Sequence, residues 1–173
     1  MGALEQFENL QFLGEEFATW LYWKSETGNG HPAIKGLDEF ELWFEAPVEL
    51  VNDYNEATSV ILKGSTPLES PEAREAFSEG KKLARARLRF NIRNQTYTCG
   101  FNAATMAITG VKLPVPPDTP EADRIHLRLE ILEEFEAFFQ KLYEVFIRLR
   151  THREHWAAER KQIRAWISKV AGD

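Results

Sequence analysis

Apolar residues recur at helical spacing throughout the last third of the chain. Alternating steps of three and four residues keep them on one side of a helix. Neither a glycine nor another proline occurs between Pro120 and Val170. We therefore predict a long amphipathic helix over residues 120–170. Its apolar stripe contains Leu132, Phe135, Phe139, Leu142, Phe146, Leu149, Trp156, Ile163, Ile167 and Val170.

A helix of this length has a consequence for assembly. At about 1.5 Å per residue it would extend roughly 75 Å, about twice the width of a domain of this size. Either the helix folds back near 151–155, or its end projects and pairs with another chain. Because the segment has no proline or glycine to make a sharp break, we favour a continuous or gently bent helix. Trp156, Ile163 and Ile167 would then be exposed and would bind a partner protein or a second copy in a homodimer.

A second helical pattern lies near the N-terminus, over residues 9–25. Gly14, inside this pattern, predicts close packing against a neighbouring element. The segment Thr27–Gly30 contains residues that accept positive φ and would end the helix. The shared apolar face contains Leu10, Leu13, Phe17, Trp20 and Leu21, which we expect to pack in the core.

Between the two helices the apolar residues alternate, which is typical of half-buried strands. Segments 38–46 and 84–93 show the alternation most clearly, and shorter strands are predicted at 48–51, 58–63 and 96–104. Turns are predicted at 53–55 and at Asn94-Gln95. Ser70, as a cap, and Pro71, in the first turn, would begin a short helix at 71–79.

These elements together predict one α+β domain spanning residues 1–173. An antiparallel sheet of about five strands, within residues 38–111, would be covered on one face by the N-terminal helix and the long C-terminal helix. The helix residues Phe135, Phe139, Leu142 and Phe146 would be buried there. The apolar face of the sheet would contain Phe40, Leu42, Phe44, Leu88, Phe90 and Ile92.

Charge is strongly segregated along the chain, although the net charge is only −6. Residues 1–80 carry 16 acidic and 4 basic side chains, whereas residues 81–112 carry 7 basic and no acidic ones. Residues 148–173 are again basic, with 7 basic and 3 acidic side chains. Such banding indicates either a surface for a polyanion or bands that pair with each other in the fold.

The basic band contains a row of arginines on one face of a predicted strand. Such a row can follow a phosphate backbone without reading its sequence. Equally, it can form cross-strand ion pairs with Glu39, Glu41 and Glu45 if the two strands are neighbours. Both explanations remain open at this level. The candidate nucleic-acid contacts are Lys81, Lys82, Arg85, Arg87, Arg89 and Arg93, together with Arg150 and Arg153 on the C-terminal helix.

No residue pattern typical of catalysis or cofactor binding is present, so we expect a non-enzymatic protein without a cofactor. His152, His155 and Glu159 share one helix face, a spacing that can ligate a metal. Neighbouring arginines would oppose a cation, so we expect a basic helix surface there instead. Cys99 is the single cysteine, which excludes an intrachain disulfide and a Cys-based zinc site.

The remaining sequence features concern location. No apolar run approaches the ~18 residues of a membrane span, and the first residues lack the pattern of a signal peptide. We therefore expect a cytoplasmic protein that does not associate with a membrane.

The segment 12–26, FLGEEFATWLYWKSE, resembles part of the C-terminal region of bacterial recombination-associated proteins of the RdgC-like family. The segment 41–45, ELWFE, is also similar, as is 64–82, which contains the elements PEAR and EGKK. This resemblance covers most of the chain loosely. It implies DNA binding without sequence preference, modulation of the RecA recombinase and assembly as a ring-forming dimer. It assigns no functional residue to a position in this sequence.

Two hypotheses for function follow. The first is a nucleic-acid-associated protein that contacts phosphates through the arginine row and the basic end of the C-terminal helix. The second is a protein-interaction or oligomerisation module whose charge bands are paired internally. The two differ in whether carboxylates cover the Arg85–Arg93 face.

Overall fold

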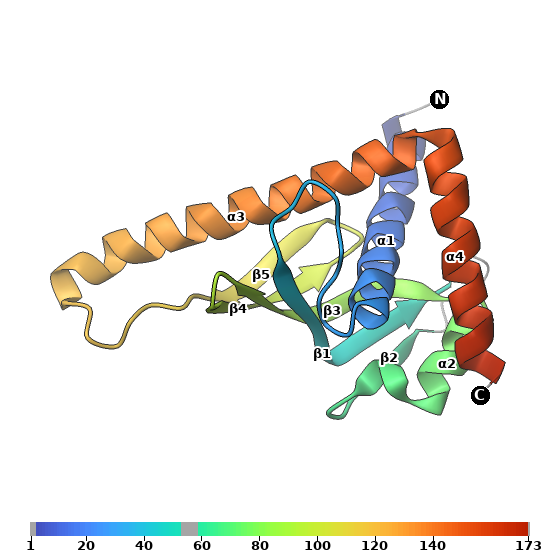
Figure 1. Ribbon diagram of the computed structural model, residues 1–173, viewed down its shortest axis with the longest axis horizontal. Helices are drawn as coiled ribbons and strands as arrows, with labels where there is room; N and C mark the ends of the chain where they lie inside the picture. The colour runs from blue at the N-terminus through green and yellow to red at the C-terminus, as the bar shows by residue number, and fades with distance from the viewer. Residues whose placement is uncertain (1–2, 53–58, 173) are drawn as a thin grey trace.

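The computed structural model describes residues 3–52 and 59–172 and contains five strands and four α-helices in this part of the chain (Figure 1). The predicted turn at 53–55 lies outside the described residues. The elements, in chain order, are α1 (Ala3–Thr27), β1 (Phe40–Val51), β2 (Val60–Leu62), the 3-10 turn η1 (Pro67–Glu69), α2 (Pro71–Ser78), β3 (Lys82–Ile92), β4 (Gln95–Asn102), β5 (Ala107–Lys112), α3 (Glu121–Thr151) and α4 (Arg153–Gly172).

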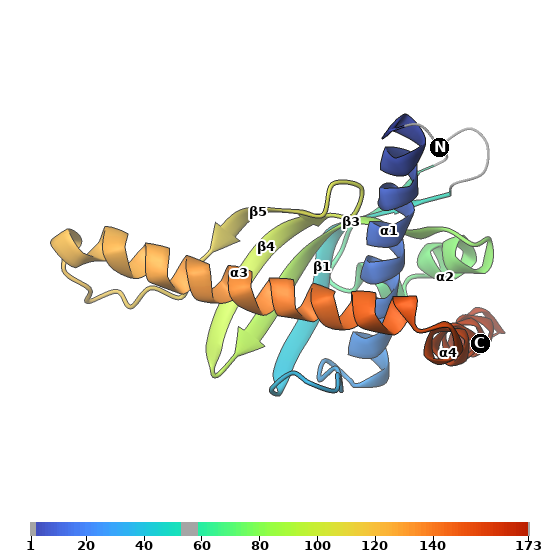
Figure 2. The same cartoon turned by 90° about the horizontal axis from the view of Figure 1, so that it is seen from above.

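The strands form one antiparallel sheet in the order β2-β1-β3-β4-β5. Helices α1 and α3 lie on the same face of this sheet and cross each other (Figure 2). The N-terminal part of α3 continues beyond the edge of the sheet (Figures 1 and 2). The predicted α+β architecture of about five strands with helices on one face is therefore confirmed.

The core lies between the sheet and these two helices. As predicted, the α3 residues Phe135, Phe139, Leu142 and Phe146 are buried, each no more than 5% exposed. The ring of Phe90, in the central strand β3, lies 5.5 Å from the Phe135 ring in an edge-to-face arrangement. Large aromatic side chains thus fill the space between α3 and the sheet.

Helix α1 packs closely against the sheet through Phe17 and Gly14. The Phe17 ring is fully buried and makes edge contacts with Phe139 and Phe146 of α3. A Cβ atom on Gly14 would lie 1.9 Å from the Ala103 carbonyl oxygen, well inside van der Waals contact. The close approach predicted from this glycine is confirmed, and α1 cannot accept a side chain at that position without shifting.

Strand β1 is one continuous element where the alternation predicted two. The breaks in alternation at Ala46-Pro47 correspond to register shifts between Glu45 and Glu49, so the strand is bulged and not interrupted. Two extra residues fit there without ending the ladder to β3. Helix α2 agrees with the prediction, because Ser70 Oγ accepts a hydrogen bond from Ala73 N at 3.2 Å.

The β3–β4 turn begins one residue earlier than predicted. Arg93 and Asn94 both have positive φ, 51° and 63°, and Ile92 pairs directly with Gln95. Positive φ at both central residues is characteristic of the tight turns that match the twist of a hairpin. Arg93 therefore lies in the turn and does not extend the arginine row of the strand.

The prediction of one continuous helix over 120–170 is wrong. His152 has φ −87° and ψ 100°, an extended conformation that ends α3, and α4 begins at Arg153. Helix α4 turns back beside α1 and α2 (Figure 1). Trp156 is consequently 6% exposed and contacts the Phe146 ring at 5.6 Å. Burial of this apolar stripe within the chain favours the break, although no glycine or proline is present.

The proposed exposed strip for a partner is accordingly absent at Trp156, and Ile163 and Ile167 are half-buried. Among the described residues, no helix has the length and apolar character that crossing a bilayer requires.

Candidate nucleic-acid interface

The eight candidate contact residues fall into two separate groups in the structure. Four lie on or beside the uncovered face of the sheet. The other four line two adjoining hollows formed with α4. The first group is Arg85, Arg87, Arg89 and Arg93, and the second is Lys81, Lys82, Arg150 and Arg153.

Each arginine of the first group faces a carboxylate. Arg89 Nε and Arg87 Nε lie 2.9 and 3.7 Å from the two carboxylate oxygens of Glu45. Arg85 Nε lies 3.6 Å from Glu49. In the β3–β4 turn, Arg93 Nη2 lies 3.4 Å from Asp38.

The pairs that Arg85, Arg87 and Arg89 make with Glu45 and Glu49 are the cross-strand ladder that the sequence offered as one of two explanations. Its acidic members differ from those expected, because Glu45 pairs with arginine but Glu39 and Glu41 do not in the described structure. Glu41 instead accepts a hydrogen bond from Asn91 Nδ2 at 3.2 Å. Since all four arginines are already close to carboxylates, this face offers a polyanion little uncompensated positive charge.

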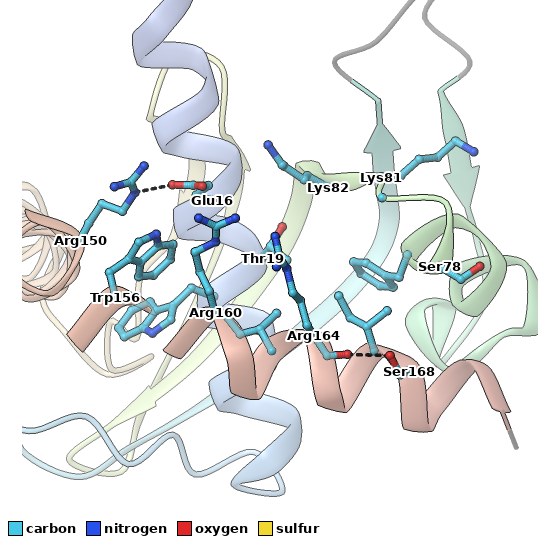
Figure 3. Close-up of a pocket in the computed structure, with 15 residues that line it drawn as sticks. Glu16, Thr19, Ser78, Lys81, Lys82, Arg150, Trp156, Arg160, Arg164 and Ser168 are labelled. Atoms are coloured by element: carbon cyan, nitrogen blue, oxygen red, sulfur yellow. Dashed lines mark hydrogen bonds and ion pairs between the residues drawn. The ribbon is translucent and has the colours of Figure 1, made fainter. Parts of the chain in front are cut away.

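Three residues of the second group, Lys81, Lys82 and Arg150, line a cleft between α4 and the body of the molecule (Figure 3). We call it the basic cleft. It has a volume of about 590 Å³. Its lining comes from α1, the end of α2, the start of β3, the end of α3, and α4. The residues that line it are Glu16, Thr19, Trp20, Phe77, Ser78, Gly80, Lys81, Lys82, Arg150, Trp156, Arg160, Ile163, Arg164, Ile167 and Ser168.

Local features of the sequence explain how distant residues reach this cleft. Gly80, at φ +86°, reverses the chain after α2, and Lys81 N then donates to Ala76 O at 2.9 Å. This arrangement is a common helix terminus, and it brings Lys81 and Lys82 beside α1. The break at His152 brings the basic residues of α4 to the opposite side.

Helix α4 is held against α1 by one carboxylate. Glu159 Oε2 accepts a hydrogen bond from Trp20 Nε1 at 3.0 Å, and Glu159 Oε1 lies 3.1 Å from Lys24 Nζ. Both partners lie on α1, so this residue fixes the position of the cleft wall.

Positive charge predominates in the cleft. Arg150 Nε donates to Glu16 Oε2 at 2.6 Å, and the Arg150 guanidinium lies 5.2 Å from the centre of the Trp156 ring. Glu16 is the single carboxylate among the described lining residues, against five basic ones. Arg160 and Arg164 are exposed. No acidic side chain of the described chain lies within 4.0 Å of either guanidinium.

A second hollow, of about 720 Å³, adjoins the basic cleft. Its lining includes Leu13 and Arg153, and it shares Arg150, Trp156 and Arg160 with the cleft. Arg153 is thereby placed beside the same surface. The positive surface therefore extends along one side of α4, from its first turn to Arg164.

Sequence reasoning missed Arg160 and Arg164 as candidate contacts. On a continuous helix Arg160 occupies the apolar stripe and has no reason to meet Lys82. The available signal was the basic excess of residues 148–173 together with the i, i+4 spacing of Arg160 and Arg164, which places them on one face. The fold-back at His152 was needed to connect these residues with the start of β3.

Cys99, His152 and His155, which the sequence analysis considered, do not line the basic cleft. Burial raises the pKa of the Cys99 thiol to about 12, so the thiol is protonated at neutral pH. The rings of His152 and His155 are stacked with centroids 3.7 Å apart, but Glu159 contacts Trp20 and Lys24 instead of joining them. In the described residues no three His, Cys, Asp or Glu side chains are grouped to hold a metal ion.

A comparison of the chain with protein-family models finds no matching family, and a comparison with curated protein sequences finds no matching protein. The resemblance to the RdgC-like family therefore remains an expectation from sequence.

Proposed function

We propose that this protein is a non-enzymatic nucleic-acid-binding protein that contacts phosphates through the basic cleft. The observation that supports this proposal is the convergence of basic side chains from two distant segments of the chain, 81–82 and 150–164. Arg160 and Arg164, which lack an acidic neighbour within the described structure, are the central contacts. Lys82, Arg150 and Arg153 complete the set. Lys81 also lines the cleft, but it is 8% exposed and pairs with Glu79, so we expect it to contribute less.

Contacts of this type favour binding without sequence preference. Lysine and arginine neutralise phosphates and release the condensed counterions, and this electrostatic gain is independent of base sequence. The arginine row on β3 is expected to contribute less, because a phosphate would have to compete with Glu45 and Glu49 for the same guanidinium groups. A role in recombination rests on the sequence resemblance alone.

The test is a salt titration of binding to a labelled oligonucleotide. We expect affinity to fall steeply with salt for the native protein. Replacing Arg160 and Arg164 with Ser should weaken binding to all sequences about equally and lower the slope by about 1 for each lost phosphate contact.

The matched control replaces Arg87 and Arg89 with Ser. These two arginines have the same charge but are paired with Glu45, so we expect a much smaller change. Absence of binding even at low salt would contradict the proposal. An equal or larger loss in the control would instead place the contact on the sheet.

One observation supports a second candidate function, a protein-interaction module. Near the start of α3, Ile125 is 72% and Leu129 55% exposed, one turn apart. The N-terminal part of this helix continues past the sheet (Figure 2). This surface replaces the C-terminal strip as the apolar face for a partner or second copy. Light scattering of the native protein and of an Ile125→Glu, Leu129→Glu variant tests it. A multimeric mass for the native protein and a monomeric mass for the variant would support self-association through this surface.

A further inference from the structure

We propose that the basic cleft takes single-stranded nucleic acid, with an unpaired base seated against the apolar part of its lining. This inference rests on the proposed function and adds the kind of strand that the cleft accepts. It follows from the combination of basic and apolar surface in one concave site.

Two arginines of α4 point into the cleft. In Figure 3 the side chains of Arg160 and Arg164 extend from α4 toward Thr19 and Lys82 on the opposite side. A strand lying between α4 and the start of β3 would therefore have cations on both sides. Phosphates on its outer edge can be contacted by either set.

The deeper lining is apolar. Ile163 and Ile167 lie one turn apart on α4, are half-buried, and share the cleft with Phe77, Trp20 and Trp156. A phosphate by itself would leave this apolar surface in contact with water. A ligand that carries a flat, largely apolar ring next to its phosphate would cover it, and nucleobases have that structure.

A duplex does not match this surface. Its bases are stacked inside and its outside consists of phosphates and sugars, so it could contact only the basic groups at the cleft mouth. A volume of about 590 Å³ is in the usual range for sites that hold small ligands. An unpaired nucleotide can enter a site of this size, whereas a double helix cannot.

The adjoining hollow can hold the next nucleotides of the bound single strand. It shares Arg150, Trp156 and Arg160 with the cleft and adds Arg153. From Arg153 to Arg164 the surface extends roughly 17 Å along the helix. This length suits a binding site on the order of 4 nucleotides, which is at the small end for single-strand proteins.

The first experiment uses the native protein and four labelled probes of equal length in competition. They are single-stranded DNA, single-stranded RNA, duplex DNA, and a single strand with abasic positions throughout its centre. We expect both single strands to bind about tenfold more tightly than the duplex. The abasic strand, which keeps every phosphate, should lose that advantage. Any preference between the DNA and RNA strands would show which sugar the cleft accepts.

The second experiment separates the apolar from the basic part of the site. Replacing Ile163 and Ile167 with Ser should weaken single-strand binding several-fold and leave duplex binding unchanged. Replacing Ile125 and Leu129 with Ser is the matched control, because these isoleucine and leucine side chains are exposed on α3, away from the cleft. Thermal unfolding verifies that each variant is folded. The comparison with the abasic strand uses the native protein, so it tests the proposal even if a variant does not fold.

The outcomes distinguish the two proposals. Equal affinity for single strand, abasic strand and duplex would overturn the single-strand inference and leave phosphate binding standing. Tighter binding of the duplex than of the single strands would likewise overturn the single-strand inference and leave phosphate binding standing. No binding to any probe at low salt would overturn both.

Discussion

The indole N–H of Trp20 donates a hydrogen bond to the carboxylate of Glu159 at 3.0 Å, although 139 positions separate the two residues. Trp20 lies on α1 with 1% of its surface exposed, and Glu159 lies on α4. The bond therefore joins the first helix of the fold to the last one. It gives α4 a fixed position that apolar contacts alone would not define.

Removal of this carboxylate should loosen α4. We expect Glu159→Ala to lower the free energy of unfolding by about 1–3 kcal/mol, because it leaves the buried Trp20 N–H without an acceptor and removes the contact to Lys24. Glu159→Gln keeps an acceptor for Trp20 and should retain most of the stability. Urea unfolding followed by tryptophan fluorescence measures both variants. Equal losses in the two would show that the hydrogen bond to Trp20 is not the main contribution.

Gly14→Ala should destabilise the protein, which is the reverse of the usual result in a helix. At an unconstrained helical site the same change stabilises by up to about 1 kcal/mol. Here the added Cβ would approach the Ala103 carbonyl oxygen to 1.9 Å, and overpacking of this kind typically costs about 1–3 kcal/mol. Thermal or urea unfolding gives the sign directly. A stabilised variant would mean that α1 lies farther from β4 and β5 than described.

Phe139→Ala should lower the free energy of unfolding by about 3–5 kcal/mol, the usual range for removing a buried phenylalanine. The Phe139 ring contacts the rings of Phe17, Phe90 and Phe101, so its loss opens a cavity between both helices and the sheet. Leu129→Ala, on an exposed part of the same helix, should change stability by less than about 0.5 kcal/mol. Denaturant unfolding distinguishes them, and a loss below about 1 kcal/mol for Phe139→Ala would contradict the described packing.

Cys99 should make stability fall with pH in the alkaline range. Burial raises the pKa of its thiol from 9.0 to about 12. Between these values the unfolded chain loses the thiol proton while the folded chain keeps it, so deprotonation favours unfolding. The contribution is fully present below pH 9 and decreases as pH rises toward 12. Unfolding measured from pH 8 to 10.5 should show a steeper decline for the native protein than for Cys99→Ala.

A second readout tests the same burial at constant pH. A thiol reagent at pH 8 should modify Cys99 only when denaturant is added. Rapid modification of the native protein would contradict the buried position of the residue in β4.

Periodicity predicted the helices and strands well because burial determines both. Phe139 and Phe146 repeat at helical spacing, and Leu88 and Phe90 alternate, since each set faces the same core. The single glycine within α1 similarly indicated the contact that Gly14 makes with Ala103. These local patterns predict element type and the buried face, and they define the α+β architecture.

The break at His152 was one of two alternatives that the length of the helix raised, but periodicity did not favour it. No glycine or proline marks it, and both flanking segments favour helix. What determines the bend is the burial of Trp156 against Phe146 together with the contact from Glu159 to Trp20, and both involve residues distant in sequence. The candidate site depends on that bend, so Lys81, Lys82, Arg150 and Arg153 could be named from sequence but Arg160 and Arg164 could not.

The position of α4 also affects when the basic cleft comes into being. Every strand of the sheet precedes α3, whereas Arg160 and Arg164 lie in the last helix. During synthesis the N-terminal parts of a protein emerge and begin to fold first. A nascent chain that has completed its sheet would therefore already contain Lys81 and Lys82 but would still lack the wall of the cleft that α4 supplies. The affinity for nucleic acid proposed here would be acquired only after α4 has been synthesised and has folded back beside α1.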